Sequence, residues 1–240
     1  MKYLLAMLLG AVAMATSAQT VSYRVETVAS GLEHPWSLAF LPDGGLLVTE
    51  RAGRLRVIEP GTDGRLRLRP EPVAGVPAVL ASGQAGLFDI LLDPDFATNR
   101  QVFLSFAHGT REANHLRVVS ARFDGRQLLG LRPVFTSQPA KSDTQHFGGR
   151  MAWLPDGSLL FGMGDGNLER TDAQRLHTHL GKFMRIHADG RVPADNPFVG
   201  DAGVRDRPLQ SSEGSRWCDE WRGRLNRMAS DTQLAQSHVC

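Results

Sequence analysis

The sequence predicts an all-β protein of the propeller class, and three observations carry this prediction. The 240-residue chain has 25 Gly and 13 Pro, which separate short apolar runs. Such punctuation is typical of short strands and turns rather than long helices. A strand–turn–strand hairpin recurs along the chain, and further short strands follow it. Repeated small sheets of this kind are typical of β-propeller blades.

The repeated hairpin has three copies, at residues 36–50, 88–106 and 151–163. A Pro-Asp turn joins the two strands of each copy, and the turn prolines, at positions 42, 94 and 155, are 52 and 61 residues apart. Pro fixes the first turn position and Asp caps the turn. A β-sandwich also has short strands and turns, but it does not predict a repeated hairpin, so the propeller is favoured.

More strands are expected after these hairpins, at residues 55–58 and 116–123. The three copies occupy about residues 22–190, whereas a propeller ring needs at least about four blades. We therefore expect only about three to three and a half blades here. Such an arc is either a fragment or closes by association, because an open arc leaves strand edges and blade faces unpaired.

The two ends of the chain are expected to lie outside the propeller. Lys2, the apolar run 3–15 and small residues before Gln19 predict a secretory signal peptide over residues 1–18, the alternative being a buried N-terminal helix. We expect a periplasmic or secreted protein with no membrane span after cleavage. From about Asp206 the strand pattern stops, and residues 206–240, which contain both cysteines, are expected to be a disordered tail.

The charge balance argues against a nucleic-acid partner. Lys and Arg total 27, and Asp and Glu total 25, so the net charge is +2. A nucleic-acid-binding domain is expected to be more strongly basic.

The densest polar segment, residues 144–150, directly precedes the first strand of the third hairpin. Loops that enter the innermost strand lie at the mouth of a propeller channel, and His146 in this loop is a candidate base. Gly148 and Gly149 would let a flat ligand approach the backbone. The alternative is that His146 is a hydrogen-bonded loop residue.

Asp165 and Gln84 are the residues expected to join His146. Asp165 follows the same hairpin, 19 residues after His146. Because the two strands of a hairpin run in opposite directions, we expect Asp165 to lie near the end of the hairpin at which His146 precedes the first strand. A carboxylate there can orient the imidazole, as in hydrolase base–orienter pairs, although Asp165 could also just form a turn. Gln84 is the equivalent polar residue of the preceding blade, and its amide suits quinone or carbonyl oxygens.

The residues themselves indicate no metal site. His177, His179 and His187 lack a convincingly spaced third ligand. Asp93 and Asp95 lack the Gly and distal Glu of a calcium loop, so a turn is favoured there.

Several segments together resemble one family. They occur in family order between about residues 27 and 204, at 31–44, 49–55, 83–87, 146–150, 181–182 and 189–198. On these motifs the chain resembles the soluble quinoprotein sugar dehydrogenases, the glucose/sorbosone dehydrogenase family that uses pyrroloquinoline quinone (PQQ). It is most similar to the bacterial aldose sugar dehydrogenase branch.

This resemblance implies a six-bladed propeller with PQQ and Ca²⁺ on the channel axis. His146 would be the catalytic base that takes the proton of the sugar C1 hydroxyl while hydride passes to the quinone. Asp165 would support His146 as a second catalytic residue, and Gln84 would contact PQQ. Ca²⁺ would polarise the quinone, and an external electron acceptor would complete the cycle.

The resemblance ends near Arg205, so we assign residues 19–205 to a partial propeller. The Arg-Asn pair, the calcium ligands and the cationic PQQ contacts that the family carries further on are not recognisable, and the tail resembles a frameshifted segment. We therefore expect the chain alone to bind PQQ poorly and to oxidise little sugar. Two alternatives remain: a non-catalytic propeller that binds sugar or a partner, and a lactonase-type propeller hydrolase.

Overall fold

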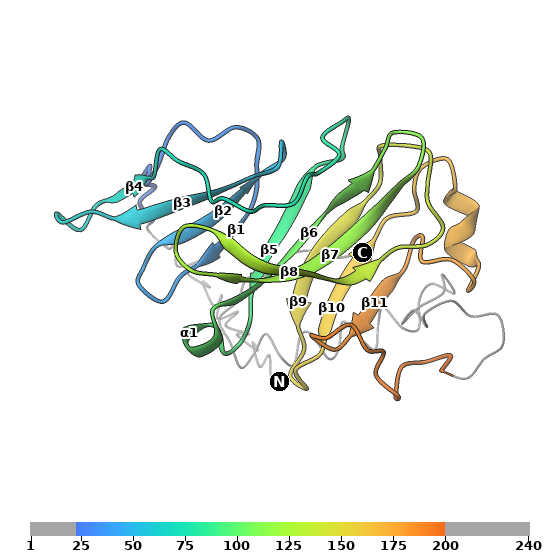
Figure 1. The fold of residues 1–240 in the computed structure, drawn as a ribbon. Coiled ribbons are helices and arrows are strands. Elements are labelled where there is room, and N and C mark those ends of the chain that lie inside the picture. The colour runs from blue at the N-terminus through green and yellow to red at the C-terminus, as the bar shows by residue number, and fades with distance from the viewer. Residues whose placement is uncertain (1–22, 200–240) are drawn as a thin grey trace, which may run out of the picture.

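The computed structural model describes residues 23–199 as three antiparallel sheets that follow one another along the chain (Figure 1). The first sheet contains β1 (Pro35–Phe40), β2 (Leu46–Glu50), β3 (Arg54–Pro60) and β4 (Leu66–Leu68). The second contains β5 (Leu87–Leu92), β6 (Gln101–Gly109), β7 (Asn114–Phe123) and β8 (Leu128–Thr136). The third contains β9 (Gly148–Trp153), β10 (Leu159–Met163) and β11 (Phe183–Ile186).

The helices of the described segment are short. They are α1 (Phe96–Asn99) and the 3₁₀ helix η1 (Arg170–Gln174). No helix within residues 23–199 combines the length and apolar character needed to cross a bilayer. The all-β prediction is therefore confirmed, and each sheet is a simple up-and-down meander.

The predicted hairpins form as β1–β2, β5–β6 and β9–β10. In the first, the Gly44 N–H donates to Leu41 O at 3.0 Å and the Gly45 N–H to Asp43 Oδ1 at 3.0 Å. In the third, Asp156 Oδ1 accepts from the Ser158 N–H at 2.9 Å in the same way. In the first and third motifs the aspartate that follows the proline thus closes the turn by accepting a main-chain hydrogen bond from two residues on.

The middle copy is longer because α1 is inserted into its turn. Asp93 Oδ1 accepts from the Asp95 N–H and from Asn99 Nδ2, both at 2.9 Å. Asp93 therefore stabilises a turn, which is the role predicted for it from the sequence.

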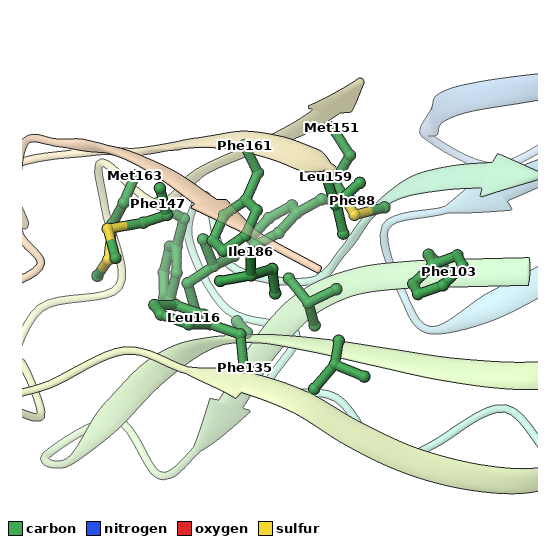
Figure 2. Packing of buried hydrophobic residues seen from close by; sticks show 14 of the residues in the cluster. Phe88, Phe103, Leu116, Phe135, Phe147, Met151, Leu159, Phe161, Met163 and Ile186 are labelled. Atoms are coloured by element: carbon green, nitrogen blue, oxygen red, sulfur yellow. The ribbon is translucent and has the colours of Figure 1, made fainter. Parts of the chain in front are cut away.

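The sheets pack face to face, and each gap between neighbours is filled by apolar side chains. Between the second and third sheets lies a cluster that includes Phe103, Leu116, Phe135, Phe147, Phe161 and Ile186 (Figure 2). A second cluster joins the first and second sheets through residues that include Leu47, Leu55, Leu104, Phe106 and Phe123. Because the middle sheet is covered on both faces, β6 is buried continuously from Val102 to Ala107.

The first strands of the three sheets, β1, β5 and β9, contact one another in that order. Asp89 on β5, whose side chain is 4% exposed, joins them. It accepts hydrogen bonds from Ser37 Oγ on β1 and from the Met151 N–H on β9, the latter at 2.7 Å. Arg150 Nη1 lies 3.2 Å from the same carboxylate. We call Ser37, Asp89, Arg150 and Met151 the hub network.

Burial raises the pKa of Asp89, although the hydrogen bonds from Ser37 and Met151 and the charge of Arg150 oppose that rise. Keeping this carboxylate buried therefore costs free energy. It contributes to the fold because its hydrogen bonds link β5 to β1 and β9, so that strands from all three sheets are joined.

The described residues form three sheets, and the expected count of three to three and a half blades stays a prediction. The six-blade ring stays a prediction, as do the domain bounds. The predicted signal peptide at 1–18 and the predicted tail at 206–240, with Cys218 and Cys240, lie outside the described residues.

Candidate active site

His146 lies in the loop that enters β9, at the same end of the third sheet as the loop that leaves β10. The two loops meet closely. A Cβ atom at Gly164 would lie 2.1 Å from His146 O, so only glycine fits there. The Gly164 N–H in turn donates to Phe147 O at 3.0 Å. His146 itself adopts a positive φ of 50°, which is uncommon for a residue other than glycine.

This close approach brings Asp165 to His146, as the hairpin argument predicts. His146 Nδ1 lies 2.7 Å from Asp165 Oδ1. The same oxygen accepts from the Asn167 N–H at 2.9 Å. The side chains are 39% and 32% exposed, so the pair is reachable from solvent. Because Asp165 engages Nδ1, the ring presents Nε2 to an incoming hydroxyl group.

Asp165 is the charged partner of this pair. Burial raises the pKa of its carboxyl, but the hydrogen bonds from the Asn167 N–H and the His146 ring, with the charges of His146 and Arg170, outweigh burial and leave that pKa below its usual value of 3.8. Asp165 is therefore a carboxylate at neutral pH and can stabilise a protonated His146.

Gln84 also meets His146. The side-chain Oε1 of Gln84 accepts from the backbone N–H of His146 at 3.0 Å, and the backbone N–H of Gln84 donates to Thr144 O at 3.1 Å. With the oxygen engaged, the amide NH₂ is the group that Gln84 can offer to a ligand. The three residues selected from the sequence are thus brought together.

Next to them is a pocket of about 330 Å³ lined by Trp36, Arg51, Gln84, Phe88, Phe147 and Gly148. Phe88 contacts both other aromatic rings, with centroids 5.6 Å from Trp36 and 5.3 Å from Phe147. Arg51 donates through Nη1 to Gly83 O at 2.9 Å. The guanidinium of Arg150 lies 4.4 Å from the Trp36 ring centroid. The pocket therefore combines flat apolar walls with positive charge.

Sequence reasoning gave no role to the pocket residues Trp36 and Arg51. Trp36 opens the first hairpin, where a large apolar residue is indistinguishable from a core residue. Arg51 is one of several arginines after β2. The one usable signal was that both lie in segments that carry the family resemblance.

The other histidines within residues 23–199 do not form such a site. His179 Nδ1 accepts from the Gln138 N–H at 2.8 Å and so holds a loop. Over residues 23–199, no group of three or more His, Cys, Asp or Glu side chains is arranged to hold a metal ion.

The lowered pKa of Asp165 leads to a prediction on acid stability. A carboxyl group with a lowered pKa in the fold stabilises it above its unfolded pKa, and this contribution is lost as the pH falls through the folded value. We expect Asp165→Asn to have a lower free energy of unfolding than wild type at about pH 6. This difference in free energy should become smaller below about pH 4. Urea midpoints measured across this range test it, and parallel pH curves for the two proteins would contradict it.

Comparisons with known proteins identify the family of the chain. The family model described as "Glucose / Sorbosone dehydrogenase" matches residues 32–214. The protein slr1608 of Synechocystis is 48% identical over 191 residues, covering 72% of this chain and 45% of that protein. The aldose sugar dehydrogenase YliI of Escherichia coli is 38% identical over 192 residues, covering 78% and 50%.

A solved structure extends the comparison to three dimensions. The PQQ-bound form of aldose sugar dehydrogenase from Streptomyces coelicolor matches with a TM-score of 0.62 and 34% identity, over 75% of this chain and 51% of that one. The chain spans about half the length of these relatives. Given the extent of the family match and the arrangement of the sheets, the chain belongs to the glucose/sorbosone dehydrogenase family.

Proposed function

We propose that the protein is a quinoprotein dehydrogenase that oxidises the C1 hydroxyl of aldose sugars to the lactone, with PQQ as the hydride acceptor. The observation that carries this proposal is the His146–Asp165 pair, 2.7 Å apart, beside a pocket with aromatic walls and a guanidinium group. Family membership supplies the reaction class, and an external electron acceptor would reoxidise the cofactor.

The pocket fits the chemistry of PQQ, which is a flat quinone that carries carboxylate groups. Trp36 and Phe147 would lie against its rings, and Arg51 would pair with a carboxylate. The NH₂ group of Gln84 would donate to an oxygen of the quinone. When bound, PQQ supplies an acceptor for a hydride and two electrons.

The described residues do not fit calcium, since they hold no cluster of suitable ligands. We propose that the calcium ligands belong to the part of the family fold that lies C-terminal to the segment matched here.

The residues present can prepare a sugar for oxidation. His146 Nε2 takes the proton of the C1 hydroxyl, which raises the electron density on that oxygen and weakens the C1–H bond. The C1 hydrogen then leaves with its bonding electrons, and a C=O bond forms at C1. Asp165 holds Nδ1 and stabilises the imidazolium that results. Gln84 holds the backbone from which His146 projects.

PQQ binding can be measured directly, because Trp36 lines the pocket and its fluorescence should be quenched. We expect Arg51→Gln to weaken PQQ binding about tenfold, the loss of one charge-assisted contact in a half-exposed site. Arg65→Gln, an exposed arginine outside the pocket, is the matched control. Trp36→Phe should remove most of the quenching. Equal affinity in the two arginine variants would contradict the role of Arg51.

Turnover is tested by dye-linked oxidation of aldoses with added PQQ and calcium, with the E. coli relative assayed beside it. Sugar oxidation that requires PQQ supports the proposal. Sugar binding without oxidation would favour the non-catalytic alternative, and lactone hydrolysis without PQQ would favour the hydrolase.

We also propose export to the periplasm or the medium, on the basis of the signal-like residues 1–18. The N-terminal sequence of the protein recovered from the periplasm tests this, and a mature chain that starts near Gln19 is the expected result.

A further inference from the structure

A second charged residue, Lys141, is buried in the loop that carries His146. It is 1% exposed although it carries an ammonium group. Its backbone is fixed to β7, because Lys141 and Asn114 exchange two main-chain hydrogen bonds of 2.9 Å. The loop from 141 to 147 therefore starts at an anchored position and ends where β9 begins.

The ammonium of Lys141 is enclosed by the same loop. Nζ donates to the carbonyl oxygens of Asp143 and of Gln145, the latter at 2.8 Å. It also lies 3.7 Å from the ring centroid of Phe147. Two of these contacts are with Gln145 and Phe147, the residues on either side of His146 in the sequence. The loop therefore surrounds the side chain of Lys141.

We propose that Lys141 is a positioning residue for His146, whose ammonium holds the main chain of residues 141–147 in the conformation that presents the imidazole to Asp165. The inference rests on the proposed role of His146 as the base. Its structural content, a link between Lys141 and the His146–Asp165 contact, can be tested without cofactor or sugar.

The charge state of Lys141 is set by its surroundings. Burial lowers its pKa to about 8, while Asp143 in its own loop and Glu169 in the loop after β10 raise it. From β7 it meets the neutral Asn114. Near neutral pH the side chain is therefore mainly an ammonium with three donors, which suits two carbonyl groups and an aromatic face.

Lys182 provides a matched control. It is 2% exposed, and its ammonium donates to the carbonyl oxygens of Asp172, Ala173 and Leu180. Burial likewise lowers its pKa to about 8. It differs from Lys141 in that none of its carbonyl partners flanks His146.

The experiment follows the His146 ring by ¹⁵N NMR in the full 240-residue chain near pH 7.5, where Lys141 is still mainly an ammonium. While Asp165 accepts from Nδ1, the neutral ring carries its proton on Nδ1; without that contact it favours Nε2. We expect K141M to lose the Nδ1–H form, as D165N does, and K182M to keep it. A K141M protein that is folded and keeps the Nδ1–H form would overturn the proposal.

If K141M does not fold, K141Q tests the same link, with K182Q as its control, because glutamine keeps a polar end but removes the ammonium. We expect K141Q to lose the Nδ1–H form of His146 and K182Q to keep it. A K141Q protein that is folded and keeps the Nδ1–H form would overturn the proposal.

Discussion

Replacing His146 with glutamine is expected to lower the rate of aldose oxidation about 10²- to 10⁴-fold relative to wild type, the usual contribution of a general base. Both proteins are assayed at saturating PQQ, because this chain is expected to bind PQQ poorly and to oxidise sugar slowly. Glutamine keeps a polar side chain but cannot accept and hold a proton. The backbone N–H that donates to Gln84 is retained, so PQQ affinity should change by no more than a few-fold. Dye-linked rates and Trp36 quenching on the same samples measure both quantities.

His187→Gln is the control for this variant, because His187 lies beyond β11 and does not line the pocket. It should retain the wild-type rate. A His146→Gln protein that keeps more than about a tenth of the rate would show that another group removes the proton.

Removing the carboxylate of Asp89 is the largest expected effect on stability. In Asp89→Ala, the buried Met151 N–H and Ser37 Oγ lose their acceptor, as does the Ile90 N–H at 3.1 Å. Unsatisfied buried donors cost about 1–3 kcal/mol each, so we expect the free energy of unfolding to fall by about 3 kcal/mol. Urea denaturation followed by circular dichroism gives this value.

An exposed aspartate sets the baseline for that measurement. Asp63 pairs with Arg67 at 2.8 Å, with side chains 44% and 57% exposed, and Asp63→Ala should leave the free energy of unfolding nearly unchanged because the pair is screened by solvent. If Asp89→Ala costs as little as Asp63→Ala, the hub network does not hold the three sheets together.

The sequence predicted the parts of this protein that depend on local patterns. The Pro-Asp turns fix the β1–β2 and β9–β10 hairpins from a few adjacent residues. The pairing of His146 with Asp165 follows from a hairpin of known length, because the strands out and back return to the same edge. These predictions needed only the alternation of strands and the chemistry of turns.

The remaining features depend on contacts between distant segments. Arg51 lines the pocket, and its side-chain Nη1 donates to Gly83 O, 32 residues on. Asp89 looks like an interruption in an apolar strand, and its partners lie 52 and 62 residues away. Lys141 reads as an ordinary surface lysine. Nothing in the local sequence of these residues specifies what they meet, since packing between sheets decides it.

The close approach at Gly164 has a consequence for how such a site can be inherited. Both members of the proton-handling pair come from one sheet, and a single glycine lets their loops touch. A recombination event or an engineered graft that moved the stretch from Lys141 to Lys182 would carry them together. The pocket proposed for the cofactor has lining residues from all three sheets, so no single segment would carry it. Under the proposed function, the proton-transfer pair could be transferred in one segment and the cofactor pocket could not.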